Sequence, residues 1–220
     1  MTKLTQFTSE DGGAEGYLVD VGDGKPGVVV LQEWWGLVPH VEDVTERFAK
    51  QGYTALSPDL YHGKSTVEAE EAQHLMEGLD WGRATKEIKA AVDFLREQGC
   101  PKVGVVGFCM GGALSMLAAA TAGVDAAVAF YGFPPPPNPM DTTCPPTKIF
   151  FGSEEGFFSV PDAQAWAADQ RERGVADTEV VIYEGAGHAF FNDTRPEAYV
   201  ESAARDAWAK TLAHFSKHLS

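Results

Sequence analysis

A short apolar run passes directly into a glycine-rich turn near the middle of the chain, and this feature constrains the fold most. Val103–Val106 is followed by Gly-Phe-Cys-Met-Gly-Gly at 107–112 and then by the alanine-rich run Ala113–Ala122. This order predicts a buried strand, a tight turn and a helix. The turn has the form of the nucleophile elbow GxSxG, with Cys109 in the position of the serine.

The spacing of the glycines in this turn has a physical reason. A nucleophile between a strand and a helix has strained backbone angles, so the residues two before and two after it must carry almost no side chain. Gly107 and Gly111 meet that requirement. We expect the sulfur of Cys109 above the C-terminal edge of a sheet, at a helix N-terminus whose amides and dipole favour a thiolate.

Two other interpretations of this turn compete with the nucleophile. A lone cysteine is usually a small buried hydrophobe, and a glycine-rich turn before a helix can bind phosphate. The segment lacks the Lys followed by Ser or Thr of a P-loop, and it does not match the dinucleotide-binding pattern GxGxxG. The setting therefore favours a nucleophilic Cys109.

The composition limits the possible partners and compartments. The 220 residues, 44% of them hydrophobic, predict a single domain over 1–220. The net charge of −15 argues against nucleic acid and anionic membrane surfaces as partners. The N-terminal segment lacks the apolar core of a signal peptide, and no run is long enough for a spanning helix, so we expect a cytoplasmic protein. The scattered Cys100, Cys109 and Cys144 predict reduced thiols without a disulfide framework or a structural zinc site.

Apolar strands alternate with amphipathic helices along the chain. The predicted strands are Thr5–Thr8, Gly16–Val21, Gly27–Gln32, Tyr53–Ser57, Val103–Val106, Ala126–Tyr131, Lys148–Phe151 and Glu179–Tyr183. The predicted helices are Pro39–Gln51, Val67–Leu79, Trp81–Gln98, Ala113–Ala122, Val160–Arg173 and Pro196–Phe215. The proline-rich segment Phe133–Pro146 is predicted to be an irregular loop. The alternation predicts an α/β fold with an antiparallel start, a mostly parallel sheet and helices on both faces.

A cysteine nucleophile needs a base, and histidine has the suitable pKa. His188 is the best candidate because it follows the last predicted strand and comes after Cys109 in the chain, as in α/β hydrolases. The other histidines have different interpretations. They are His40 and His74 within helical patterns, His62 in a loop that could line the pocket, and His214 and His218 as solvated helix-end residues.

The acid and the oxyanion hole are expected at other strand ends. After the strand Lys148–Phe151 we choose Glu155 over the adjacent Glu154 as the carboxylate that orients His188. Asp162 is a weaker candidate because a capping box with Ser159 already explains it. The backbone amides of Met110 and Trp34 are expected to form the oxyanion hole.

With these residues assigned, the chain resembles the dienelactone hydrolase family, a carboxymethylenebutenolidase-like branch of the α/β hydrolases. The resemblance covers nearly the whole chain through the ordered motifs LQEWWG, SPDLYHG, VGVVGFCMGG, FYG, FGSEEGFF and GAGHAFFND. It implies an α/β-hydrolase fold, hydrolysis of small esters or lactones through an acyl-cysteine intermediate, and no metal or cofactor. It also implies that Glu33 contacts the resting thiol and takes part in forming the thiolate when substrate binds.

Two departures from the family pattern bear on the substrate. The triad acid is usually aspartate, whereas Glu155 is one methylene longer. The family prototype binds the substrate carboxylate with two arginines, where this chain has Gly63 and Asn192. We therefore expect a neutral, more apolar substrate than dienelactone. The side chains expected to line its site are Trp35, Tyr61, His62, Tyr131, Phe190 and Asn192.

Two other classes of function remain open from the sequence. The chain could be a thiol redox or sensor protein that uses Cys109, although neither Cys100 nor Cys144 is an evident resolving partner. The chain could also be a non-catalytic binding protein on the same fold. We expect a monomer or small homo-oligomer.

Overall fold

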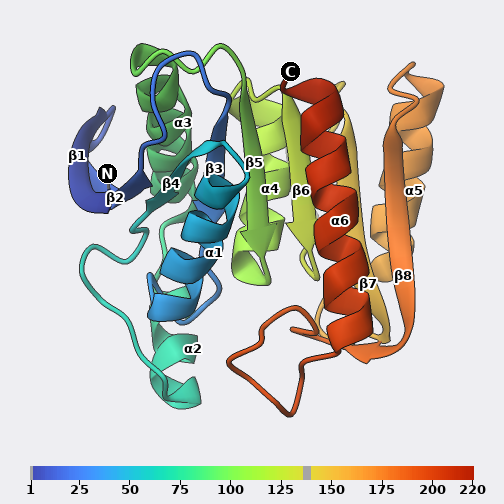
Figure 1. Cartoon of the computed structure of the whole chain (residues 1–220). Coiled ribbons are helices and arrows are strands. Elements are labelled where there is room, and N and C mark those ends of the chain that lie inside the picture. The colour runs from blue at the N-terminus through green and yellow to red at the C-terminus, as the bar shows by residue number, and fades with distance from the viewer. Residues whose placement is uncertain (1, 136–139) are drawn as a thin grey trace.

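The computed structural model describes residues 2–135 and 140–220, and it contains one eight-stranded sheet (Figure 1). Its order is β1-β2-β4-β3-β5-β6-β7-β8. The strands are β1 Thr2–Ser9, β2 Gly12–Val19, β3 Gly27–Leu31, β4 Thr54–Pro58, β5 Val103–Phe108, β6 Ala126–Phe130, β7 Thr147–Glu154 and β8 Thr178–Gly187. The β1–β2 and β2–β4 pairs are antiparallel, and the pairs from β4–β3 to β7–β8 are parallel. This arrangement confirms the predicted antiparallel start and the mostly parallel sheet.

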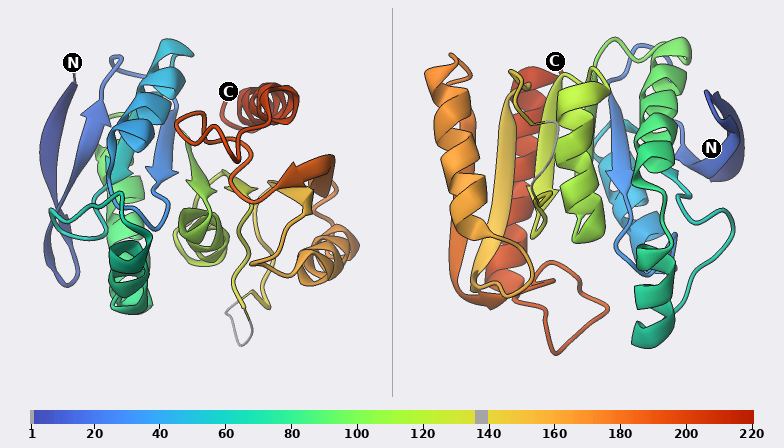
Figure 2. Two further views of the ribbon diagram at one scale, coloured as in Figure 1. Left: turned by 90° about the horizontal axis from the view of Figure 1, so that it is seen from below. Right: turned by 180° about the vertical axis from the view of Figure 1, so that it is seen from behind.

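Helices cover both faces of the sheet. They are α1 Pro39–Lys50, α2 Ala69–Glu77, α3 Trp81–Glu97, α4 Met110–Thr121, α5 Val160–Glu172 and α6 Glu201–His218. Seen along the sheet, α1 and α6 lie on one face, and α3, α4 and α5 lie on the other (Figure 2). The strands β3, β4, β5 and β6 are buried at every residue because helices exclude water from both of their faces.

The last strand and the last helix differ most from the sequence prediction. β8 runs on to Gly187 because Glu154 of β7 pairs with Gly187 beyond an irregularity at Gly152–Glu154. α6 begins at Glu201 rather than at Pro196. Before it, turns occupy the chain, and the amide of Val200 donates to the carbonyl of Phe190. These contacts hold the loop after β8 at one end of the sheet, where α2 also lies (Figure 1).

Other expectations hold with small shifts in the boundaries. Ser159 caps α5 by accepting a hydrogen bond from the amide of Asp162. Part of the predicted proline-rich loop, 136–139, lies outside the described residues. The prediction of His214 as a solvated helix-end residue is wrong, because α6 packs on β6 and β7 and buries that side chain completely. Within 2–135 and 140–220, none of the helices is long and apolar enough to span a membrane.

Candidate active site

Cys109 occupies a strained elbow between β5 and α4. Its backbone angles are φ 54° and ψ −117°, which non-glycine residues rarely adopt. A Cβ on Gly107 would lie 1.8 Å from the carbonyl oxygen of Gly111, and a Cβ on Gly111 would lie 2.4 Å from that of Gln32. The backbone approaches so closely here that neither position has room for a side chain, as the spacing of the two glycines predicts.

Backbone strain gathers at the edge of the sheet that carries Cys109. The described non-glycine residues with positive φ are His62, Cys109, Tyr131 and Ala189. They follow β4, β5, β6 and β8 respectively, at the ends where the parallel strands finish. Such conformations cost on the order of 1–3 kcal/mol each and cluster at functional sites. Their common location therefore makes this edge the candidate for the functional one.

The environment of Cys109 opposes the thiolate. Burial raises the pKa of this thiol far above its usual value, and the negative charge of Glu33 raises it further. Hydrogen bonds from the backbone amides of Met110 and Trp34 act in the opposite direction. Both amides therefore point at the sulfur, from the start of α4 and from the loop after β3. These are the two donors expected for an oxyanion hole.

Glu155 is the carboxylate that contacts His188. Its two oxygens lie 3.2 and 2.9 Å from Nδ1 of His188, and its side chain is only 1% exposed. The neighbouring Glu154 is exposed. Burial alone would raise the pKa of Glu155, but hydrogen bonds from His188 and from the amides of Phe157 and Phe158 bring it below the ordinary value. An ionised Glu155 accepts the proton on Nδ1, so Nε2 of His188 is left free as a base.

Three aromatic rings surround His188. The ring centroids of Phe157, Tyr131 and Phe158 lie 4.7, 5.0 and 5.9 Å from that of the imidazole. Phe157 is 77% exposed and covers His188 from the solvent side. The sequence analysis gave no role to Phe157 or Phe158, although both directly follow the Glu155–Gly156 turn after β7.

Glu33 is buried and has two hydrogen-bond donors from distant parts of the chain. Its carboxylate accepts from the hydroxyl of Tyr131 at 3.2 Å and from the side-chain amide of Asn192 at 2.8 Å. Glu33 and Asn192 are 3% and 2% exposed. We expected Asn192 to line the substrate site. Its amide instead binds Glu33, the carboxylate whose negative charge acts on Cys109.

The remaining expected substrate residues have different positions. The hydroxyl of Tyr61 lies 3.3 Å from the sulfur of Met110, next to the elbow. Phe190 is completely buried and packs between the rings of Tyr131 and Tyr183. His62 lies 2.9 Å from Glu87, so its ring is held by α3.

A cavity of about 400 Å³ lies beside Trp35 and Asn192. Arg195, which also lines it, has its guanidinium 5.2 Å above the ring of Trp35 and is ion-paired with Glu197. Trp35 packs edge-on against Trp34, which supplies one amide to the sulfur of Cys109. Besides Arg195 and Glu197, most of the side chains that line it are apolar or neutral.

Comparison with known proteins identifies the group to which this chain is similar. The dienelactone hydrolase family matches residues 15–219. "Protein usf" of Aquifex pyrophilus is 35% identical over 233 residues, with 100% of both chains covered. A "Putative carboxymethylenebutenolidase" of Synechocystis sp. is 33% identical over 242 residues, which covers 99% of this chain and 97% of that one.

A solved structure agrees with the fold over nearly its whole length. The crystal structure of a "Putative Dienelactone Hydrolase" from Klebsiella pneumoniae has a TM-score of 0.82 and 25% identity, and the alignment covers 99% of this chain and 98% of that chain. The mixed sheet and its covering helices therefore form an α/β-hydrolase fold. Because the family match extends over almost the entire sequence and the fold agrees with it, this chain belongs to the dienelactone hydrolase family.

Proposed function

We propose that this member of the family hydrolyses small ester or lactone bonds with Cys109 as the nucleophile. His188 acts as general base and acid, and Glu155 orients it. The name of the Synechocystis relative, "Putative carboxymethylenebutenolidase", supports this class of substrate. The observation that carries the proposal is the strained elbow of Cys109, at which the amides of Met110 and Trp34 converge.

The proposed reaction has two stages. The thiol proton of Cys109 passes to His188 as the sulfur attacks the carbonyl carbon, and the amides of Met110 and Trp34 stabilise the oxyanion. The intermediate then collapses, the carbon–oxygen bond to the leaving group breaks, and His188 protonates the alkoxide. In the second stage His188 takes a proton from water, and the resulting hydroxide attacks the thioester carbonyl. The carbon–sulfur bond then breaks, the carboxylic acid leaves, and His188 returns the proton to the sulfur.

The two positions where the family prototype has arginines support a neutral substrate. The nearby guanidinium of Arg195 stacks on Trp35 and is paired with Glu197. Gly63 donates its backbone amide to Asp59, and Asn192 donates to Glu33. Neither position offers a guanidinium to a substrate carboxylate, so we expect neutral esters to be preferred over anionic ones.

The thiol redox alternative has little support in the geometry. Cys109 follows the C-terminal end of β5, whereas Cys100 precedes β5 and Cys144 precedes β7. The strands between these ends, β5 and β7, are six and eight residues long, which corresponds to roughly 20–26 Å. A disulfide needs Cα atoms closer than about 7 Å, so neither thiol is positioned to resolve an oxidised Cys109.

Burst kinetics test the proposed function. We expect p-nitrophenyl acetate to give a rapid burst of p-nitrophenolate followed by steady turnover with the wild type, and neither phase with Cys109→Ala. Cys144→Ala is the matched control, because it removes a buried thiol away from the site and should retain the burst. Equal activity of the wild type and Cys109→Ala would rule out the cysteine mechanism.

A further inference from the structure

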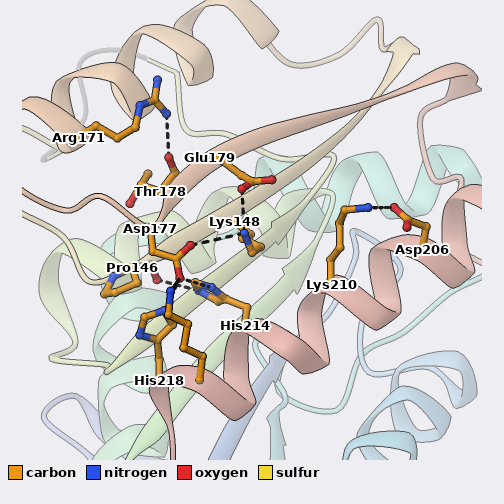
Figure 3. Close-up of polar contacts among 11 residues, drawn as sticks. Pro146, Lys148, Arg171, Asp177, Thr178, Glu179, Asp206, Lys210, His214 and His218 are labelled. Carbon is orange, nitrogen blue, oxygen red and sulfur yellow. Dashed lines mark hydrogen bonds and ion pairs between the residues drawn. The ribbon is translucent and has the colours of Figure 1, made fainter.

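A cluster of two histidines and an aspartate lies away from the proposed active site. His214 and His218 are one helical turn apart near the end of α6, and Asp177 immediately precedes β8 (Figure 3). One ligand atom from each residue lies within 4.8 Å of the others. Because Asp177 precedes β8, the cluster lies at the opposite end of the parallel strands from Cys109 and His188.

His214 has a buried nitrogen without a hydrogen-bond partner. Its side chain is completely buried, and its Nε2 donates to the carbonyl of Pro146 at 3.1 Å. Because Nε2 carries the proton that is donated to this carbonyl, Nδ1 is the ring nitrogen available to a ligand. This Nδ1 forms no hydrogen bond, and it lies 3.7 Å from Oδ2 of Asp177, which has no proton to donate.

Nδ1 of His214 and Oδ2 of Asp177 therefore face each other without a hydrogen bond between them, and a cation placed there could bind both. Lysines supply part of that charge, because Lys217 lies 3.0 Å from Oδ2 of Asp177 and Lys148 lies 3.7 Å from Oδ1. Neither ammonium has an interaction with Nδ1 of His214. Lys148 also pairs with Glu179 at 3.0 Å, and the side chain of Lys217 is 64% exposed, so it can move into solvent.

We propose that this cluster binds a divalent transition-metal ion of the Zn²⁺ class. The ligands are Nδ1 of His214, Nε2 of His218 and Oδ2 of Asp177, with water completing the coordination. Two nitrogens and one carboxylate oxygen form a set that Zn²⁺ accepts, at bond lengths of about 2.0–2.2 Å. Nε2 of His218 and Oδ2 of Asp177 are 2.5 Å apart in a direct hydrogen bond. To bind one ion they would move to about 3.3 Å apart, and the ion would replace the shared proton.

The position of the cluster indicates a structural role. The ion would join the end of α6 to the segment that enters β8, and Pro146 before β7 already holds His214. A metal that binds only the folded chain stabilises it by mass action. This inference is independent of the proposed hydrolase mechanism, because it uses none of the same residues.

Calorimetric titration with Zn²⁺ tests the proposal, and the Cys109→Ala protein is used so that the elbow thiol cannot bind the ion. We expect one equivalent to bind. Loss of a ligand should weaken that binding by at least about tenfold in His218→Ala and in Asp177→Asn. His74→Ala is the matched control, because it removes an exposed histidine on α2 and should leave the affinity unchanged. Absence of binding, or binding that survives His218→Ala, would overturn the site.

Lys217→Ala separates a metal site from a purely ionic cluster without disturbing the core. Removal of the competing ammonium should tighten Zn²⁺ binding and increase the rise in melting temperature that Zn²⁺ produces. An ionic cluster without a metal predicts only lower stability in this variant, with no effect of Zn²⁺. In the Co²⁺-loaded protein, visible absorption bands that disappear in His218→Ala would identify the histidine ligand. Unchanged bands would contradict it.

Discussion

At Cys109, burial and charge act against the thiolate while two backbone amides favour it. Burial and the charge of Glu33 raise the pKa of the thiol, and the amides of Met110 and Trp34 lower it. The resting sulfur is therefore protonated and poorly nucleophilic. A protonated, buried thiol is protected from adventitious alkylation and oxidation.

Glu33→Gln tests this balance. Removal of the negative charge should lower the pKa of Cys109, while the amide can still accept from Tyr131. Alkylation of the thiol by iodoacetamide should then begin at lower pH than in the wild type, although ester turnover falls. Glu154→Gln, which changes an exposed carboxylate, should leave the alkylation profile unchanged. An unaltered profile in Glu33→Gln would show that the charge of Glu33 does not control the thiol.

Glu155→Gln tests the orientation of His188. A glutamine can donate to Nδ1 and favour the wrong tautomer, with Nε2 protonated and unable to act as a base. We expect kcat for p-nitrophenyl acetate to fall by about 10²-fold to 10⁴-fold. Glu155→Asp retains the charge and should lose much less activity, whereas Glu154→Gln should lose none. A Glu155→Gln enzyme with wild-type kcat would remove Glu155 from the mechanism.

For single residues, a contact can be predicted from the sequence only where a local pattern indicates where both residues lie. Glu155 and His188 are predictable because each follows a strand, and parallel strands end at one edge. The donors to Glu33 are not predictable from local pattern, because Tyr131 and Asn192 are 98 and 159 residues away from it. Nothing in a strand pattern specifies which side chains meet across such separations.

At the scale of elements, the elbow depends on close backbone contact more than on any side chain. A methyl group on Gly107 would overlap the carbonyl oxygen of Gly111, so β5 and α4 would have to separate. We expect Gly107→Ala to lower the free energy of unfolding in urea by at least about 3 kcal/mol. Gly13→Ala in β2 is the control, since a Cβ there meets nothing within 4 Å, and it should change stability by less than about 0.5 kcal/mol. Equal stability of the two variants would contradict the close packing of the elbow.

The ends of helices and strands can be predicted where they depend on local sequence, but not where they depend on tertiary contacts. Continuous apolar runs give β3, β5 and β6 almost to the residue, because burial on both faces leaves a strong local signal. The start of α6 is set by turns and by the Val200–Phe190 hydrogen bond, which depend on tertiary structure. The extension of β8 likewise depends on the pairing of Gly187 with Glu154.

At the scale of the whole molecule, the buried thiols make stability depend on pH above neutrality. Burial raises the pKa of both Cys100 and Cys144 from 9.0 to about 11. The folded state therefore retains these protons at a pH where the unfolded chain has lost them. The stability from each thiol is fully present below pH 9 and is lost as pH rises through the folded pKa.

This linkage predicts a measurable loss of stability in alkaline buffer. With reductant present, each of the two thiols should cost about 1 kcal/mol of unfolding free energy between about pH 8 and pH 10. The net charge of −15 adds general repulsion over the same range, so the wild type alone cannot separate the causes. The double variant Cys100→Ala, Cys144→Ala retains the charge and lacks the thiols, so its urea midpoint should fall less over this interval. If the two proteins lose stability equally, the thiols of Cys100 and Cys144 are not the cause of the alkaline loss of stability.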